Sequence, residues 1–161
     1  MGYTHYFGFK NGAKIDAERW NKALELGKAC MEASGVIIKG GDGTGEPIIN
    51  EKEICLNGDG DNGCETFYLE SKGQYTNGFC KTCRCPYDIV VCCFLLSFKW
   101  VFGKEFIYTS DGTTRGDLRK KRNKEYWAKN IPNWKPKVED EWSAAYKLFN
   151  KVRKQLYPKE A

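Results

Sequence analysis

The chain is organised around one apolar stretch, Pro86-Tyr87-Asp88-Ile89-Val90-Val91-Cys92-Cys93-Phe94-Leu95-Leu96-Ser97-Phe98-Lys99-Trp100-Val101-Phe102-Gly103. Pro86 suits the first position of a helix, Asp88 places a carboxylate in the first turn, and Gly103 is a typical C-terminal stop. Because the segment between them is apolar nearly all round, it predicts the central, buried helix of the core. Its longest uncharged run, residues 89–98, is too short to span a bilayer, so no membrane partner is expected.

The sequence on either side predicts strands and further helices. Residues 2–10 are rich in aromatic side chains and alternate as a strand does, with Tyr3 and His5 on the same face. A helix is predicted from the N-cap Asp16 to a glycine stop at Gly35. Shorter strands are predicted at 36–39, 48–49, 54–56, 65–69 and 106–109, with turns at 40–45 and 57–63. This order predicts an α+β fold, with an antiparallel or mixed sheet packed with about three helices in a single compact domain.

Positive charge is concentrated in the C-terminal third of the chain. Residues 104–161 hold 15 basic and 8 acidic side chains, against 11 and 13 in residues 1–103, a distribution that favours anionic partners. Residues 118–161 are predicted to form a basic helical extension of the domain, interrupted at residues 132–136. The last helix has an apolar stripe consisting of Val138, Trp142, Ala145, Phe149, Val152 and Leu156.

A basic run in this extension, residues 119–124, is followed by Tyr126, Trp127 and Trp134. Positive charge combined with aromatic rings can bind single-stranded nucleic acid by stacking on the bases. The same residues could also clamp a small phosphorylated ligand or form an ordinary solvated helix face, which we favour for most of them. Nucleic acid is therefore a less favoured partner than a small ligand.

Eight cysteines are present, and five of them lie between Cys80 and Cys93. A zinc ribbon needs two Cys-x-x-Cys pairs, whereas only Cys80 and Cys83 have that spacing, and Cys55 and Cys64 lie at irregular distances. The sequence therefore predicts no bound metal and no cofactor. The first residues show no signal-peptide pattern, so we expect a cytoplasmic protein whose cysteines remain thiols.

An acidic loop offers one further place for a hard cation, through Asp59, Asp61 and Glu65. Counted from Asp59, Gly63 and Cys64 occupy the positions where a calcium loop has an oxygen ligand and a glycine. The departure from that pattern favours an ordinary turn.

The segment before the apolar helix has the residue types of an anion site. Lys81, Thr82 and Arg84 could contact one phosphate through an ammonium, a hydroxyl and a guanidinium, beside the N–H groups of a helix start. Cys80, close to two cations, is either a reactive thiolate of lowered pKa or a thiol packed in a turn. His5 is the sole histidine, so any imidazole acid–base catalysis must use it, and the alternative is a hydrogen-bonded structural histidine.

Three motifs carry a resemblance to a known group of proteins. They are Gly2-Tyr3-Thr4-His5-Tyr6, Glu65-Thr66-Phe67, and Phe79-Cys80-Lys81-Thr82 followed by Arg84 and Pro86-Tyr87-Asp88. Together they resemble small, mostly uncharacterised proteins of bacteriophages and prophages, over residues 2–110. Small phage proteins of this kind often act against host defence, for instance by sequestering or cleaving the nucleotide signals of bacterial immunity. The resemblance implies a ligand site formed by Tyr3, His5, Tyr6, Glu65, Cys80, Lys81, Thr82, Arg84, Tyr87 and Asp88.

Three functions follow as expectations. The leading one is a nucleotide-binding protein that forms a homo-oligomer and sequesters a cyclic or ADP-ribose-derived immune signal in the host cytoplasm. The first alternative is a metal-independent, phosphodiesterase-like enzyme in which His5 is the acid–base group and Asp88 or Glu65 orients it. The second alternative is a nucleic-acid-binding protein that uses the basic C-terminal region.

Overall fold

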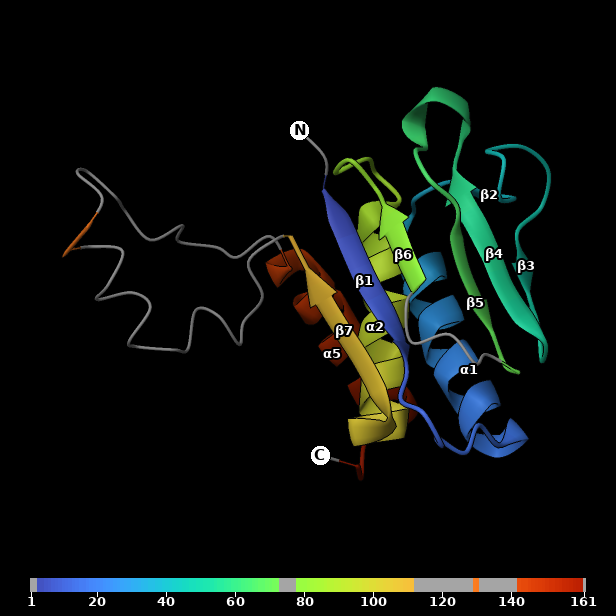
Figure 1. Cartoon of the computed structure of the whole chain (residues 1–161), viewed down its shortest axis with the longest axis vertical. Coiled ribbons are helices and arrows are strands. Elements are labelled where there is room, and N and C mark those ends of the chain that lie inside the picture. Colours follow the sequence, from blue (N-terminus) through green and yellow to red (C-terminus); the bar gives the residue numbers. More distant parts are fainter. Residues whose placement is uncertain (1–2, 73–77, 112–128, 131–141, 161) are drawn as a thin grey trace.

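A layer of antiparallel strands and a layer of three α-helices make up the structure, a computed structural model that describes residues 3–72, 78–111, 129–130 and 142–160 (Figure 1). The strands are β1 (Thr4–Phe9), β2 (Ile38–Lys39), β3 (Ile48–Ile49), β4 (Glu53–Gly58), β5 (Phe67–Glu70), β6 (Gly78–Lys81) and β7 (Phe106–Ser110). The helices are α1 (Ala17–Ser34), α2 (Asp88–Phe102) and α5 (Ser143–Leu156), with short 3-10 turns at Gly60–Asn62 and Gly103–Glu105. The predicted α+β class is confirmed.

The strands form two groups that lie side by side. In the first, β1 lies between β6 and β7 and is antiparallel to both. In the second, β4 pairs with β2, β3 and β5, again antiparallel. Figure 1 shows β6 of the first group next to β5 of the second. The two groups thus form one layer, and one face of this layer is turned towards the helices. The start of β1, the end of β6 and the end of β7 lie at the same end of the molecule.

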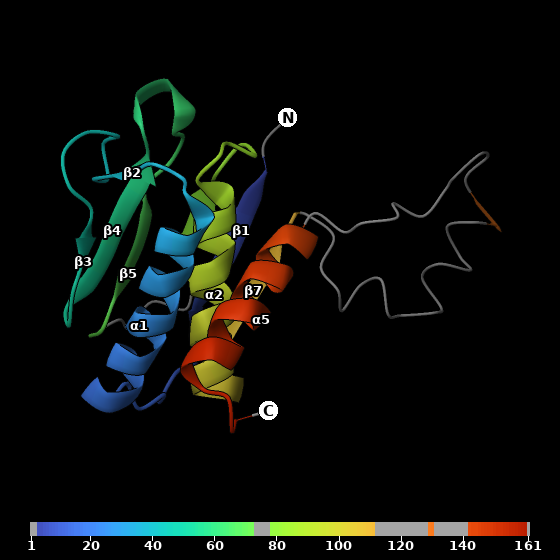
Figure 2. The ribbon, with the colours of Figure 1, turned by 180° about the vertical axis from the view of Figure 1, so that it is seen from behind.

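The helix ends follow the residues that the sequence marks. Asp16 caps α1 by accepting a hydrogen bond from the backbone N–H of Arg19, and Gly35 ends the helix with φ 68°. Gly103 ends α2 with φ 57°. Figure 2 shows α2 between α1 and α5, and ten of its fifteen residues are buried, which confirms α2 as the central helix.

The core between the layers is largely aromatic. Phe98 of α2 contacts Trp20 from α1 and Phe9 from β1, with ring centroids 5.0 Å and 6.1 Å away. Helix α1 approaches α2 closely at Gly27, where an added Cβ would lie 2.3 Å from the Phe94 ring. The glycine is thus needed for the helix packing rather than for its backbone freedom.

Several elements differ from the sequence predictions. Strand β2 is shorter than the predicted 36–39, and β4 extends to Gly58 because Asn57 and Gly58 pair with Lys39 and Ile38 of β2. The sequence predicts no strand at β6, whose four residues directly precede the polar turn before α2. The stripe of α5 is buried at Ala145, Phe149 and Val152 but exposed at Leu156.

Part of the C-terminal extension belongs to the core. Helix α5 packs beside α2, and Trp142 just before it has no exposed surface. The basic run 119–124 and its aromatic neighbours lie outside the described residues, as do the interruption at 132–136 and Val138. In the described ranges no helix is long and apolar enough to cross a membrane.

Candidate functional site

The sole histidine lies at the centre of a buried hydrogen-bond network. His5 has no exposed surface. Its Nδ1 lies 2.8 Å from Ser110 Oγ, and its Nε2 lies 2.6 Å from Asp88 Oδ1. Ser110 is the residue opposite His5 on β7, so the strand register brings it there, and Asp88 begins α2. Residues far apart in the sequence therefore meet on one imidazole.

Both ring nitrogens of His5 have a hydrogen-bond partner. Nε2 shares a hydrogen bond with the Asp88 carboxylate, and Nδ1 shares one with the Ser110 hydroxyl. Trp142 Nε1–H donates to the same Ser110 Oγ over 3.3 Å, which ties this hydroxyl to the residue before α5. The imidazole is therefore satisfied at both nitrogens, as a structural histidine requires.

Asp88 joins this buried network to the surface. Its Oδ1 also accepts a hydrogen bond from Thr82 Oγ1 at 2.5 Å, while its side chain keeps 17% of its surface exposed. Its Oδ2 has a longer contact, 3.7 Å, with Cys92 Sγ. With Oδ1 held by two donors, Oδ2 is the oxygen that has acceptor capacity left for a ligand.

Aromatic rings enclose the imidazole on two sides. Tyr3 and Trp142 both meet the His5 ring edge-on, with ring centroids 5.0 Å and 5.2 Å away. Burial raises the pKa of the adjacent Cys92 thiol well above its usual value. The imidazole itself is therefore shielded from solvent, whereas Asp88 and Ser110 on either side of it are half-buried.

A pocket of about 330 Å³ opens beside Asp88. Tyr3, Arg84 and Cys92 line it together with Asp88, and Ala145 contributes an apolar side from α5. The guanidinium carbon of Arg84 lies 4.2 Å from the centre of the Tyr3 ring, in a cation–π contact. The pocket therefore combines a cation, an aromatic ring and a carboxylate on a partly apolar floor.

The turn that carries Arg84 has an unusual backbone. Cys83 and Arg84 have φ values of 54° and 57°, and the N–H of Cys85 donates to the carbonyl of Thr82 over 2.9 Å. Two consecutive positive φ angles inside such a turn are normally found with glycine or asparagine. Left-handed residues of other types cost about 1–3 kcal/mol each and persist where surrounding contacts hold them. The turn is thus held in a strained shape at the edge of the pocket.

The anion site predicted from Lys81, Thr82 and Arg84 is only partly assembled. Arg84 lines the pocket, but Thr82 has no exposed surface and its hydroxyl donates to Asp88, so it supports the carboxylate and is not available to a phosphate. Lys81 does not line the pocket. Two of the N–H groups at the helix start are also engaged, because Asp88 N and Val90 N donate to backbone carbonyls.

Cys80 differs from its predicted role as a low-pKa thiolate. It lies in β6 opposite His5, has no exposed surface, and burial raises the pKa of its thiol to about 12. A buried thiol of raised pKa is a poor nucleophile. The alternative of a thiol packed in a turn is also corrected, because the residue lies in a strand.

The other residues implied by the resemblance do not line the pocket. Glu65 accepts a hydrogen bond from Lys81 N and does not reach His5, so Asp88 is the carboxylate that orients the imidazole. The hydroxyl of the buried Tyr87 donates to the Glu65 carbonyl over 2.7 Å. Tyr6 lies on the outer face of β1, away from the pocket.

One group of side chains has the composition of a metal site. Among the described residues, His5, Asp88 and Cys92 are the cluster whose ligand atoms all lie within 4.8 Å of one another. Tetrahedral zinc would separate its nitrogen and oxygen ligands by about 3.3 Å, whereas Nε2 and Oδ1 are 2.6 Å apart. The spacing fits a hydrogen bond. Asp59, Asp61 and Glu65 do not form such a cluster.

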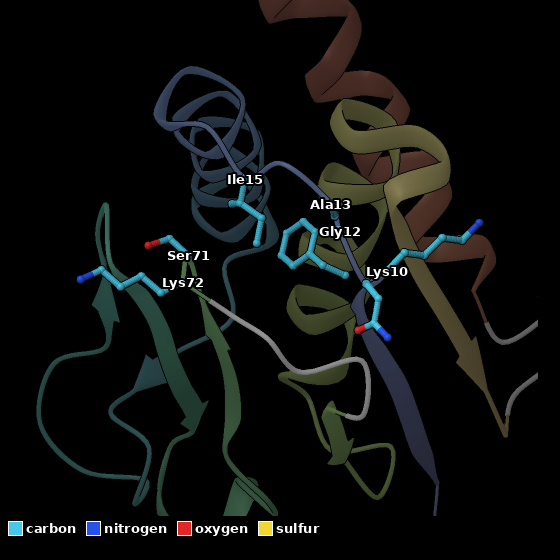
Figure 3. Close-up of a pocket in the computed structure, with 8 residues that line it drawn as sticks. Lys10, Gly12, Ala13, Ile15, Ser71 and Lys72 are labelled. Carbon is cyan, nitrogen blue, oxygen red and sulfur yellow. The ribbon is translucent and has the colours of Figure 1, made fainter.

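Another hollow, of about 470 Å³, lies between the end of β1 and the end of β5 (Figure 3). It has two cations at its edge, but Figure 3 shows Lys10 and Lys72 pointing away from each other on opposite sides. Charges that diverge cannot bind one small anion together. The pocket beside Asp88 is therefore the better candidate site.

Sequence reasoning missed three contributors to the network, namely Ser110, Cys92 and Trp142. Cys92 and Trp142 were correctly predicted to be buried, but nothing in their spacing indicates which residue they face. Comparisons of the chain with protein-family models, with curated proteins and with solved structures found no match. The function is therefore argued from the site.

Proposed function

We propose that the protein binds a small phosphorylated nucleotide in the pocket between Arg84 and Asp88. The observation that carries this proposal is the placement of a guanidinium, an aromatic ring and a carboxylate around one cavity. Arg84 suits a phosphate, because a guanidinium donates two parallel hydrogen bonds to phosphate oxygens. Asp88 Oδ2 suits a donor on the same ligand, such as a ribose hydroxyl or a base amine.

The buried state of His5 supports binding over cleavage. His5 does not line the pocket, and both of its ring nitrogens are engaged by Ser110 and Asp88. A general base needs an available lone pair within reach of the proton it removes. The network accordingly serves to hold Asp88 in place rather than to transfer protons.

The resemblance to bacteriophage proteins supports a nucleotide signal of bacterial immunity as the ligand, which the protein would bind in the cytoplasm of the host.

Homo-oligomerisation belongs to the same proposal. Phe79 and Tyr6 pair directly across β6 and β1 and are 61% and 46% exposed, which supplies an apolar surface for self-association. Native mass spectrometry of the purified chain measures the oligomeric state.

Cleavage of the same ligand is the second candidate, and one observation favours it. The 2.6 Å contact between Asp88 and His5 is the orienting contact that an acid–base histidine requires. In that case a ligand must displace the Ser110 contact or open the Trp142 wall before the imidazole can act. Nucleic-acid binding has no comparable support from the described residues.

The test is incubation of the protein with cyclic dinucleotides, cyclic ADP-ribose isomers and ADP-ribose, followed by heat denaturation and chromatography. Recovery of intact nucleotide from the denatured protein supports binding, and a converted nucleotide supports cleavage. Arg84→Gln is expected to weaken capture about tenfold or more, since a charge-assisted contact contributes about 1.5–3 kcal/mol. Lys72→Gln removes an exposed charge outside the pocket and serves as the control. Equal capture by both variants, or no capture of any nucleotide, contradicts the proposal.

A further inference from the structure

Two cysteines differ from the other six in their exposure. All eight are free thiols, and only Cys64 and Cys83 are exposed, while the others are buried or half-buried. The same two lie against each other, with 2.8 Å between their Sγ atoms. They come from different parts of the fold, since Cys64 precedes β5 and Cys83 follows β6.

The backbone of Cys64 is held in place by one buried side chain. Asn57, 5% exposed at the end of β4, accepts a hydrogen bond from Cys64 N over 3.1 Å and donates one to Cys64 O over 3.0 Å. The same amide donates to Gly41 O, which anchors it to a second turn. Cys64 is therefore positioned by the fold, although its side chain is exposed.

The backbone of Cys83 is also held by hydrogen bonds. Its N–H lies 3.3 Å from the Tyr3 carbonyl, inside the strained turn that also carries Arg84. Next to it, Glu65 and Lys81 exchange two hydrogen bonds of 3.0 Å, one through the Glu65 carboxylate. This clamp joins the residue after Cys64 to the strand before Cys83, so the two thiols have little freedom to separate.

We propose that Cys64 and Cys83 form a reversible disulfide, which makes this pair a redox modification site of the protein. The oxidant is a small disulfide such as oxidised glutathione. The Cys83 thiolate attacks one sulfur of that disulfide, breaks its S–S bond and releases one glutathione thiolate. The Cys64 thiolate then attacks the mixed disulfide at Cys83, forms the internal S–S bond and releases the second thiolate. Both cysteine protons go to solvent, and the two glutathione halves are reduced.

The surroundings of Cys64 suit it to the second step. Desolvation of its sulfur and the hydrogen bond to Cys83 raise the pKa of Cys64 to about 11. A thiol of raised pKa is ionised less often than an ordinary cysteine. Cys64 therefore suits the second attack, which is intramolecular, because the closeness of the two sulfurs compensates for the smaller thiolate fraction. Burial of Cys80 and Cys92 raises their pKa values and removes both from competition.

The experiment treats the folded, reduced chain with oxidised glutathione and measures its intact mass and its peptide map under non-reducing conditions. The expected product is a chain that has lost two hydrogens and carries no glutathione, with one bridge between the peptides of Cys64 and Cys83. Cys64→Ser and Cys83→Ser are each expected to stop at a stable glutathione adduct on the remaining exposed thiol. Cys55→Ser, which removes a half-buried thiol, is the matched control and is expected to form the same bridge.

A second measurement does not depend on variants. The bridge closes a loop across the two turns, so oxidation of the wild-type chain is expected to raise its thermal midpoint by several degrees, and reduction by dithiothreitol is expected to reverse it. The proposal is overturned if the wild-type chain stays unoxidised or keeps glutathione on both thiols. A bridge between any other pair, or loss of the bridge in Cys55→Ser, overturns it as well.

Discussion

Replacing Asp88 by alanine tests whether the histidine network is held together by this carboxylate. Asp88 Oδ1 is the acceptor for His5 Nε2 and for Thr82 Oγ1, and neither donor has any exposed surface. A buried donor left without its acceptor costs about 1–3 kcal/mol. The two donors together predict a loss of about 2–6 kcal/mol, a large share of the roughly 5–15 kcal/mol by which domains are stable.

Urea unfolding followed by tryptophan fluorescence measures this loss, because Trp142 packs against the His5 ring. Asp88→Asn is the matched control. Its amide keeps an oxygen at the position of Oδ1, so it is expected to lose less than half as much free energy of unfolding as Asp88→Ala. An alanine variant within about 0.5 kcal/mol of wild type would refute the reasoning, and so would an asparagine variant as unstable as the alanine one.

Three further predictions concern the stability of the fold. Gly27→Ala is expected to lower the free energy of unfolding by about 1–3 kcal/mol in urea, because its Cβ would lie 2.3 Å from the Phe94 ring; an unchanged midpoint contradicts the close helix approach. Cys83→Gly, under reducing conditions, is expected to raise the thermal midpoint by relieving a residue at φ 54°, and a lower midpoint would mean that the turn is unstrained. The free energy of unfolding is expected to fall as pH rises from about 9 to 12. Burial raises the pKa of Cys80 to about 12 in the folded chain, so the unfolded chain releases the thiol proton first. A free energy of unfolding in urea that stays constant above pH 9 contradicts this.

Local patterns in the sequence predicted much of the fold. Asp16 and Gly35 mark the ends of α1, and the uninterrupted apolar run before Gly103 marks α2 as central. These features depend on residues within a few positions of one another, so they can be identified without the tertiary structure. Sequence periodicity does not identify strand β6, because it is only four residues long and is followed by polar turn residues.

The site was less accessible to sequence reasoning. Asp88 was named as one of two carboxylates that could orient His5, and the structure selects it over Glu65. Ser110 and Trp142 lie far from His5 in the sequence, and they meet it only because of the strand register and the packing of α5. Single-sequence patterns report local periodicity and do not report such long-range pairs.

The position of β1 has a consequence for how the protein is made on the ribosome. β1 is synthesised well before its two neighbours β6 and β7, which begin only at Gly78 and Phe106, and Trp142 follows later still. Until those strands have been made, the aromatic strand with His5 therefore has neither of its pairing partners. Strand pairing that is late and non-local slows folding and leaves an exposed apolar strand that chaperones can bind. The pocket acquires its last wall only once Ala145 of α5 has left the exit tunnel.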